Sequence, residues 1–214
     1  DLAVPLARVA AQYGDLPKPF KRYQIAPVWR AEKPGRGRFR EFFQCDADIV
    51  GSPSLISDAE CVALDYNVMT ALGISNVEIR LSSRKMLTAL GGALGVSDEK
   101  QLATIFRTID KLPSQGREVV IQLLGSEAGC DAAQIETILK FVEIDGDNDA
   151  KLAAASDVLG DSAAEAVSDL RTVLSYAVSL GADAKTLSLD FSIARGLDYY
   201  TGTVYETFLT DLPG

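Results

Sequence analysis

The sequence contains no histidine among its 214 residues, and this absence excludes several kinds of chemistry. Catalysis by a serine–histidine or cysteine–histidine pair is excluded, because both need an imidazole as the base. A mixed histidine–cysteine metal site is excluded for the same reason. The three cysteines, Cys45, Cys61 and Cys130, are far apart in the sequence and are typical of a reducing compartment, so we expect a cytoplasmic protein. Chemistry in this chain must rest on arginine, carboxylates, tyrosine and bound ions.

Long apolar runs are also absent. No stretch of 18 apolar residues occurs, so no membrane span and no membrane partner are expected. No cationic and then apolar leader opens the chain, so no secretory signal is visible. The first residue is not methionine, and we therefore expect a fragment of a longer protein. A hydrophobic content of 47% can bury the core of one domain, or of one domain with an insertion.

The most informative stretch runs from Arg22 to Asp48 and predicts two strands joined by a basic turn. The expected strands cover residues 22–32 and 38–50, and residues 33–37 between them have the proline and glycine of a turn. Alternate residues of a strand share a face, and here that face is poor core material, because burying unpaired charge is costly. It suits a ligand with phosphates, a flat ring and an amino group. Arg30 and Glu32 share a face of the first strand, and one face of the second strand carries Arg38, Arg40, Phe42, Gln44, Asp46 and Asp48.

Positive charge is concentrated in the same region. The whole chain has 21 basic and 30 acidic residues, a net charge of −9, whereas residues 18–40 have eight basic residues and only one acid, Glu32. Such a patch attracts a polyanion, and the planar fork of arginine suits phosphate oxygens. The alternative is a solvated hairpin with scattered surface charge. The interleaved Glu32, Phe42, Gln44 and Asp48 favour a ligand site.

The same residues resemble a known motif. The sequence VWRAE at 28–32, a basic loop, and RFREFFQCDADIVG at 38–51 resemble the second signature motif of class II aminoacyl-tRNA synthetases. ARGLDYYTGTVYE at 194–206 resembles the histidine-specific segment of the histidyl-tRNA synthetase family, and DLAVPLAR at 1–8 resembles its DLTVPxAR segment. Two separate motifs in the right order make the match strong, and the resemblance extends over nearly the whole chain.

The resemblance implies an α+β fold, with a mixed, mainly antiparallel sheet flanked by helices and an all-helical insertion domain. We expect the catalytic core at residues 1–82 and 161–214, and the insertion domain at 83–160, where short helical patterns are separated by Gly, Asp, Pro and Ser. The family places this domain over the active site, towards the tRNA acceptor stem. Ser162 and Glu165 predict a capping box at the start of a helix over 162–180. Residues 187–193 and 203–208 alternate as strands.

The resemblance also implies a histidine–tRNA ligase that activates L-histidine with ATP and transfers it to the acceptor end of tRNA(His). Mg²⁺ accompanies the ATP, no separate metal site is expected, and the full-length protein is expected to be a homodimer. The first step needs positioning and charge stabilisation rather than a side-chain nucleophile. One alternative is a non-catalytic, synthetase-like regulatory subunit or a sensor of uncharged tRNA. Another is a nucleotide-binding module of a different fold.

Residue roles follow from the family motifs. The two catalytic candidates are Arg30, on the α-phosphate and the substrate carboxylate, and Arg195, which supplies a second positive charge there. Ala3 replaces the family's threonine and removes one hydroxyl from the histidine site. For ATP, the expected residues are Arg30, Glu32 at the adenine amino edge, Arg38 at the terminal phosphates, and Phe42 under the adenine ring. The histidine-binding residues are Asp1, Leu2, Ala3, Arg30, Gln44, Asp48, Arg195, Tyr199 and Tyr200.

Overall fold

The computed structural model describes residues 1–194 and 200–212, and the chain divides into two compact units at residues 57 and 58. The described residues of the first unit contain a two-stranded sheet, and those of the second contain a three-stranded sheet with many helices. The predicted α+β fold with an antiparallel sheet is therefore confirmed.

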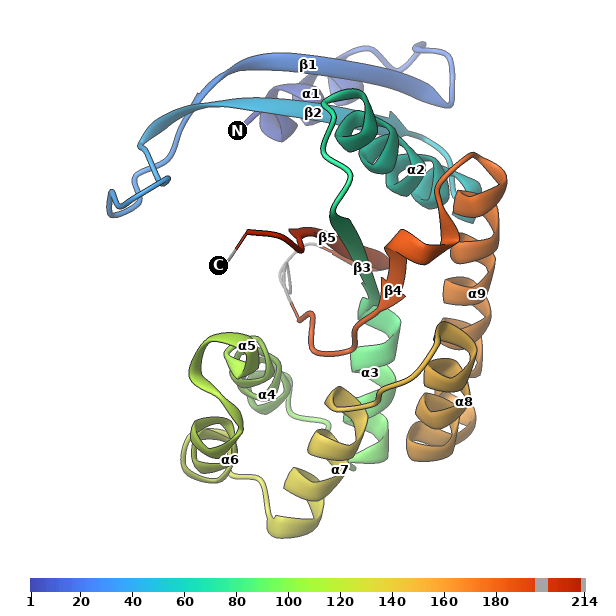
Figure 1. The fold of residues 1–214 in the computed structure, drawn as a ribbon. Helices are drawn as coiled ribbons and strands as arrows, with labels where there is room; N and C mark the ends of the chain where they lie inside the picture. The colour runs from blue at the N-terminus through green and yellow to red at the C-terminus, as the bar shows by residue number, and fades with distance from the viewer. Residues whose placement is uncertain (195–199, 213–214) are drawn as a thin grey trace. The chain divides into compact units, whose positions relative to one another are not determined.

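A long antiparallel hairpin forms most of the first unit (Figure 1). The helix α1 (Ala3–Gln12) precedes the strands β1 (Phe20–Trp29) and β2 (Glu41–Val50). Both strands are shorter than predicted, because the ladder loosens towards the turn. There the Arg30 N–H donates to the Arg40 carbonyl oxygen (2.8 Å), and Gly35 and Arg38 exchange both backbone hydrogen bonds (3.0 and 3.1 Å). The tip is therefore a tight turn centred on residues 36 and 37.

The glycine at this tip offers a test of the turn. Gly37 has φ +70°, a conformation that favours glycine, whereas Gly35 has a negative φ. No other atom lies within 4 Å of a Cβ built on either residue, so only the backbone distinguishes them. We expect Gly37→Ala to lower the free energy of unfolding by about 1 kcal/mol and Gly35→Ala to leave it nearly unchanged, as measured by urea denaturation. Equal effects of the two substitutions would contradict the turn described here.

The two faces of the hairpin differ in character. Residues paired across the strands have the same parity, as in Arg22 opposite Asp48 and Val28 opposite Phe42. The even-numbered residues form a face on which half of the side chains are polar, called the even face below. The odd-numbered residues form an apolar face, on which Tyr23 is 81% and Phe43 73% exposed. Only the even face carries the candidate site residues of the two strands.

The helix α2 (Leu55–Ala71) begins in the first unit and continues into the second. Its buried residues are Ala59, Val62 and Ala63.

The sheet of the second unit has β3 (Val77–Ser83) at its centre, parallel to β4 (Leu187–Leu189) and antiparallel to β5 (Thr203–Leu209) (Figure 1). The strand predicted over 187–193 ends early at Leu189. Asp190 ends it, because its Oδ1 accepts from both the N–H (2.9 Å) and the hydroxyl (2.6 Å) of Ser192. A side chain that bonds the backbone two residues ahead turns the chain away from the ladder.

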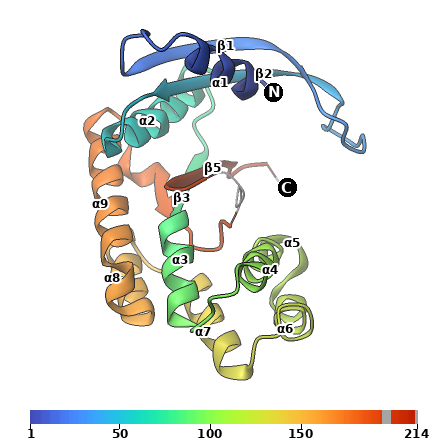
Figure 2. The ribbon, with the colours of Figure 1, turned by 180° about the vertical axis from the view of Figure 1, so that it is seen from behind.

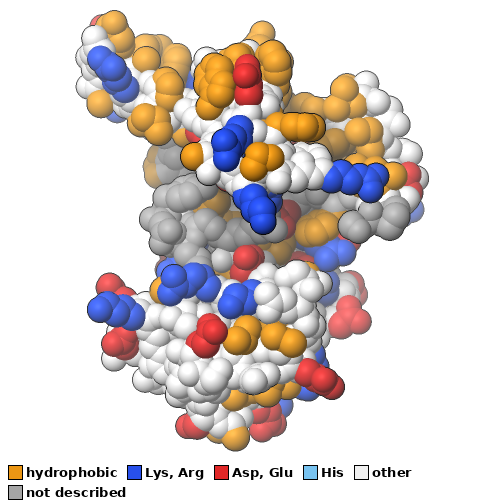
Figure 3. All heavy atoms as spheres, turned by 90° about the vertical axis from the view of Figure 1, so that its left-hand side faces the viewer, with side chains coloured by type: hydrophobic (Ala, Val, Ile, Leu, Met, Phe, Trp, Pro, Cys, Tyr) orange, Lys and Arg blue, Asp and Glu red, His pale blue; other side chains and the backbone are white. Residues whose placement is uncertain are grey.

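Between β3 and β4 the chain is helical, and α3, α8 and α9 lie side by side (Figures 1 and 2). On the face shown in Figure 3, acidic and basic side chains alternate over the helices α4 to α6 without a continuous basic band.

A separate insertion domain at 83–160, and the other domain boundaries, stay a prediction. The elements are α3 (Arg84–Ala93), α4 (Glu99–Ile109), α5 (Leu112–Gln115), α6 (Arg117–Ser126), α7 (Ala132–Val142), α8 (Asn148–Leu159), α9 (Ala164–Ser179) and the 3-10 turns η1 (Gly160–Ala163) and η2 (Ala184–Thr186).

The helix starts include one capping box and correct one sequence prediction. The capping box of Asp131 and Gln134 begins α7. The box predicted at Ser162 and Glu165 is wrong, because the chain runs directly from η1 into α9 and the Ser162 hydroxyl donates to the Leu159 carbonyl oxygen (2.8 Å). Glu165 instead accepts a hydrogen bond from Lys85, which also bonds to Asp169. In the described part of the chain, no helix combines the length and apolarity needed to cross a membrane.

Candidate substrate-binding site

The N-terminal residues lie against the even face of the hairpin. The Leu2 N–H donates to Gln44 Oε1 (3.2 Å), and Arg22 Nη2 donates to the Leu2 carbonyl oxygen (3.1 Å). Both backbone groups of Leu2 are thus held by side chains from the two strands, and its own side chain is buried. Ala3 follows as the exposed first residue of α1. This contact brings the DLAVPLAR segment and the hairpin motif together, as the sequence reasoning requires.

Arg30 joins the same group of residues. Its Nε donates to Asp1 Oδ1 (3.0 Å), and its guanidinium lies over the Phe42 ring at 5.1 Å from the centroid. Among the described residues, only Nε of this guanidinium has a hydrogen-bond partner, and the side chain is 41% exposed. The two terminal nitrogens are therefore available to a carboxylate or a phosphate. A purine that stacks on Phe42 has to share this ring with Arg30.

A buried ion pair supports the middle of the hairpin. Arg22 Nη2 lies 3.0 Å from Asp48 Oδ2, with side-chain exposures of 13% and 27%. Within the described chain, Arg22 Nε and Asp48 Oδ2 are buried and have no hydrogen-bond partner, so this contact is a pairing of charges without hydrogen-bond geometry. The sequence reasoning gave Asp48 a role and missed Arg22 as its support. The predicted turn over residues 33–37 has its midpoint at residue 35, which places residues 22 and 48 opposite one another, and that signal could have found it.

Glu32 and Arg38 form a second, more exposed pair near the turn. Arg38 Nε lies 3.5 Å from Glu32 Oε2, and Arg40 Nε donates to the Glu32 carbonyl oxygen (3.2 Å). The predicted roles give adenine to Glu32 and the terminal phosphates to Arg38. Both roles require this contact to open, which costs little because an exposed ion pair contributes about 0–1 kcal/mol.

The remaining predicted residues belong to the second unit. Tyr200 is 45% exposed. Arg195 and Tyr199 lie outside the described residues, so their predicted roles stay predictions. The chain that leads to them is well anchored, because Ile193 and Ala194 are buried.

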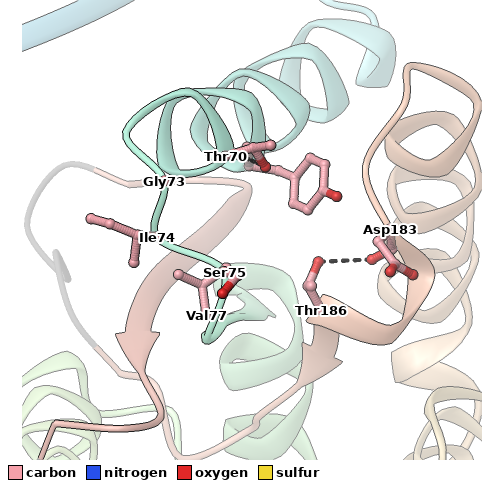
Figure 4. A pocket seen from close by; sticks show the side chains of 8 residues that line it. Thr70, Gly73, Ile74, Ser75, Val77, Asp183 and Thr186 are labelled. Atoms are coloured by element: carbon pink, nitrogen blue, oxygen red, sulfur yellow. Dashed lines mark hydrogen bonds between the residues drawn. The ribbon is translucent and has the colours of Figure 1, made fainter.

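Two hollows in the second unit are weaker candidates for a ligand site. One of about 320 Å³ lies between the end of α2, residues 73–77 and η2 (Figure 4). Its threonine hydroxyls bond to the local backbone, as Thr186 does to the Asp183 carbonyl oxygen (2.7 Å), so they are not directed at a ligand. The other hollow, of about 560 Å³, contains Arg80, which already pairs with Glu78 (2.8 Å) and Asp190 (3.3 Å). Neither hollow contains a residue that the family resemblance assigns to a substrate.

Comparison with known proteins identifies the family. The sequence model described as histidyl-tRNA synthetase matches residues 1–214. The chain belongs to the histidyl-tRNA synthetase family. It is 43% identical over 217 residues to histidine–tRNA ligase from Rhodopirellula baltica, covering 100% of this chain and 49% of that protein. The chain therefore spans about half the length of the curated relatives that it matches.

Solved structures of the family have the same fold. The crystal structure of histidyl-tRNA synthetase from Nostoc sp. PCC 7120 has a TM-score of 0.88 and 39% identity, covering 98% of this chain and 48% of that one. A structure from Bacillus halodurans C, described as an ATP phosphoribosyltransferase regulatory subunit/histidyl-tRNA synthetase, has a TM-score of 0.83 at 19% identity, with 100% and 54% covered. At 19% identity the likeness shows the fold alone. The sequence resemblance to histidyl-tRNA synthetases is therefore confirmed.

Proposed function

We propose that this chain is the partial catalytic region of a histidine–tRNA ligase, which forms histidyl-adenylate from L-histidine and ATP and transfers the histidyl group to tRNA(His). The observation that carries the proposal is the contact of the N-terminal residues with the even face of the hairpin. Asp1, Arg30 and Gln44, three residues that the family resemblance assigns to histidine, are joined there through Leu2 and the Arg30–Asp1 pair. The chain therefore offers a positive group and carboxylates at one place.

In the first step a carboxylate oxygen of histidine attacks the α-phosphate of ATP. A new oxygen–phosphorus bond forms, the bond to the bridging oxygen breaks, and pyrophosphate leaves. Arg30 would hold the two anions in line through its terminal nitrogens and offset the charge that grows on the phosphate, and Arg195 would add a second positive charge. The nucleotide enters as MgATP, with the metal as part of the substrate.

Selection of histidine needs both acceptors and donors. With Oε1 engaged by Leu2, Gln44 offers its amide N–H groups to a carboxylate or an unprotonated ring nitrogen. Asp1 and Asp48 are acceptors for the ammonium group and for the ring N–H, and a carboxylate facing an imidazole fixes its tautomer. Tyr199 and Tyr200 would close the ring pocket. Ala3 leaves this site without the hydroxyl that a threonine would supply.

The other partners follow from the family. The acceptor end of tRNA(His) is the second substrate, the complete protein is a homodimer in the cytoplasm, and the helices between β3 and β4 face the acceptor stem. The mixed charges over α4 to α6 in Figure 3 favour recognition of the stem by shape over strong backbone attraction.

The complete polypeptide should catalyse histidine-dependent exchange of labelled pyrophosphate into ATP. We expect exchange with L-histidine and none above background with other amino acids, because the site carries acceptors for a ring N–H. Aminoacylation of tRNA(His) should follow in the same preparation. A protein that binds histidine but catalyses neither reaction would instead be a regulatory subunit or a sensor of uncharged tRNA, the alternative suggested by the regulatory-subunit name of the distant neighbour.

A further inference from the structure

Two hydrogen bonds of one kind connect α2 to β5 in the second unit. The Thr203 hydroxyl donates to Asp58 Oδ2 (2.8 Å), and the Thr207 hydroxyl donates to Asp65 Oδ2. The two acids lie two turns apart on α2, and the two threonines lie on the same face of β5. The helix and the strand are therefore held together by two matched contacts between a hydroxyl and a carboxylate.

Between these contacts lies Tyr205. Partial withdrawal from water, together with the nearby Cys61, Asp65, Tyr200 and Asp58, raises the pKa of the Tyr205 hydroxyl above its ordinary value. The residue as a whole keeps 37% of its surface exposed, so it lies at the rim of the contact rather than in the core. The acidic side of α2 therefore faces β5, and Tyr200 lies near Tyr205.

Only the first contact lies within the histidine-specific segment, whereas Thr207 follows its last residue. Thr203 directly follows Gly202, and a Cβ built on Gly202 would lie 3.9 Å from Asp58 Oδ2. The Gly202 carbonyl oxygen accepts a hydrogen bond from the Arg84 N–H (2.8 Å), at the end of β3. Residues 202 and 203 are thus held from one side by the carboxylate of Asp58 and from another by the backbone of Arg84. Tyr200 lies two residues before this anchor.

We propose that Asp58 is a positioning residue for histidine binding, which fixes residues 202 and 203 of the histidine-specific segment and so orients Tyr200. This inference rests on the proposed function. The physical reason is that α2 is a continuous helix of 17 residues, and a hydrogen bond to an ionised acceptor is stronger than one between neutral groups. A support of this kind matters because small displacements of a binding group cost affinity and rate.

The matched contacts provide the kinetic experiment. In the complete protein, Asp58→Ala and Thr203→Val should raise KM for histidine in pyrophosphate exchange by about 10-fold, with KM for ATP changed less than about twofold. Asp65→Ala and Thr207→Val remove the equivalent bond seven residues after Tyr200 and should leave both KM values within about twofold. Thr203→Ser keeps the hydroxyl and should restore the wild-type value. The proposal would be overturned if KM for histidine rose equally in the Asp58 and Thr203 variants and in the Asp65 and Thr207 variants.

A second measurement does not depend on activity. Amide hydrogen exchange at residues 200–203 should be about 10-fold faster in Asp58→Ala and Thr203→Val than in Asp65→Ala and Thr207→Val, because local opening becomes easier when an anchor is lost. Equal exchange in both sets would overturn the proposal, even if the wild-type protein catalyses histidine activation. Absence of histidine-dependent activity in the wild type, with this difference in amide exchange present, would overturn the proposed function and the role in histidine binding, but not the anchor itself.

Discussion

Replacing Arg30 by alanine should lower the rate of histidine-dependent pyrophosphate exchange by about 10²- to 10³-fold, the loss typical of one charge-stabilising donor. The side chain is half exposed, its terminal nitrogens have no partner among the described residues, and its Nε is held 3.0 Å from Asp1 Oδ1. The guanidinium is therefore oriented before a substrate arrives. Single-turnover measurement of adenylate formation would show that the loss lies in chemistry rather than in product release.

Two control variants separate this role from simple charge. Arg30→Lys keeps the positive charge but loses the planar fork, so we expect an intermediate loss of about 10-fold. Lys21→Ala removes one positive charge from the odd-numbered face of β1 and should change the rate by less than about twofold. If Lys21→Ala were as damaging as Arg30→Ala, general attraction of the nucleotide by the basic hairpin would explain the effect, and the assigned role would be wrong.

Replacing Phe141 by alanine should lower the free energy of unfolding by about 3–5 kcal/mol, which makes it the largest stability effect expected for this chain. Phe141, on α7, is fully buried, and its ring stacks on that of Phe191 at 5.0 Å between centroids and 18° between planes. Removing the ring loses its burial, this aromatic pair and the packing around it. Urea denaturation followed by circular dichroism would measure the change.

Two control variants should lower the free energy of unfolding much less. Phe141→Leu keeps most of the side-chain volume. Val119→Ala changes a residue of α6 that is 39% exposed, and we expect a loss of less than about 1 kcal/mol. Phe191 lies four residues before Arg195, so Phe141 also supports the approach to that segment. A loss below about 1 kcal/mol for Phe141→Ala would contradict the packing described here.

The hairpin was the most predictable part of the molecule from sequence. Side chains alternate with a period of two in a strand, so the shared face of Phe42, Gln44 and Asp48 could be predicted without coordinates. The ends of the strands could not, because pairing near a glycine-rich turn depends on how the tip closes. The partner of Asp48 needed the register, which becomes fixed only when the centre of the turn is known.

Contacts between distant parts of the sequence were beyond prediction. Asp58 and Thr203 are 145 residues apart, and no local pattern indicates that they meet. Glu165 was predicted to cap its own helix, yet it forms an ion pair with Lys85, which is distant in the sequence. Ser162 lies in the preceding 3-10 turn, where its hydroxyl bonds to the Leu159 carbonyl oxygen. Similarly, Asp190 shortened β4 through a local bond that the alternating pattern of residues 187–193 does not reveal.

The pairing of the hairpin strands also limits how its tip can change length. Arg22, Arg30, Gln44 and Asp48 share a face only because the residue numbers of every pair sum to an even number. If one residue were inserted or deleted at the tip, the strands would pair in a register shifted by one residue. The side chains of one strand would then lie on the apolar face. Changes of two residues preserve the arrangement, so natural variation in this loop should favour even steps, with odd steps compensated by a bulge.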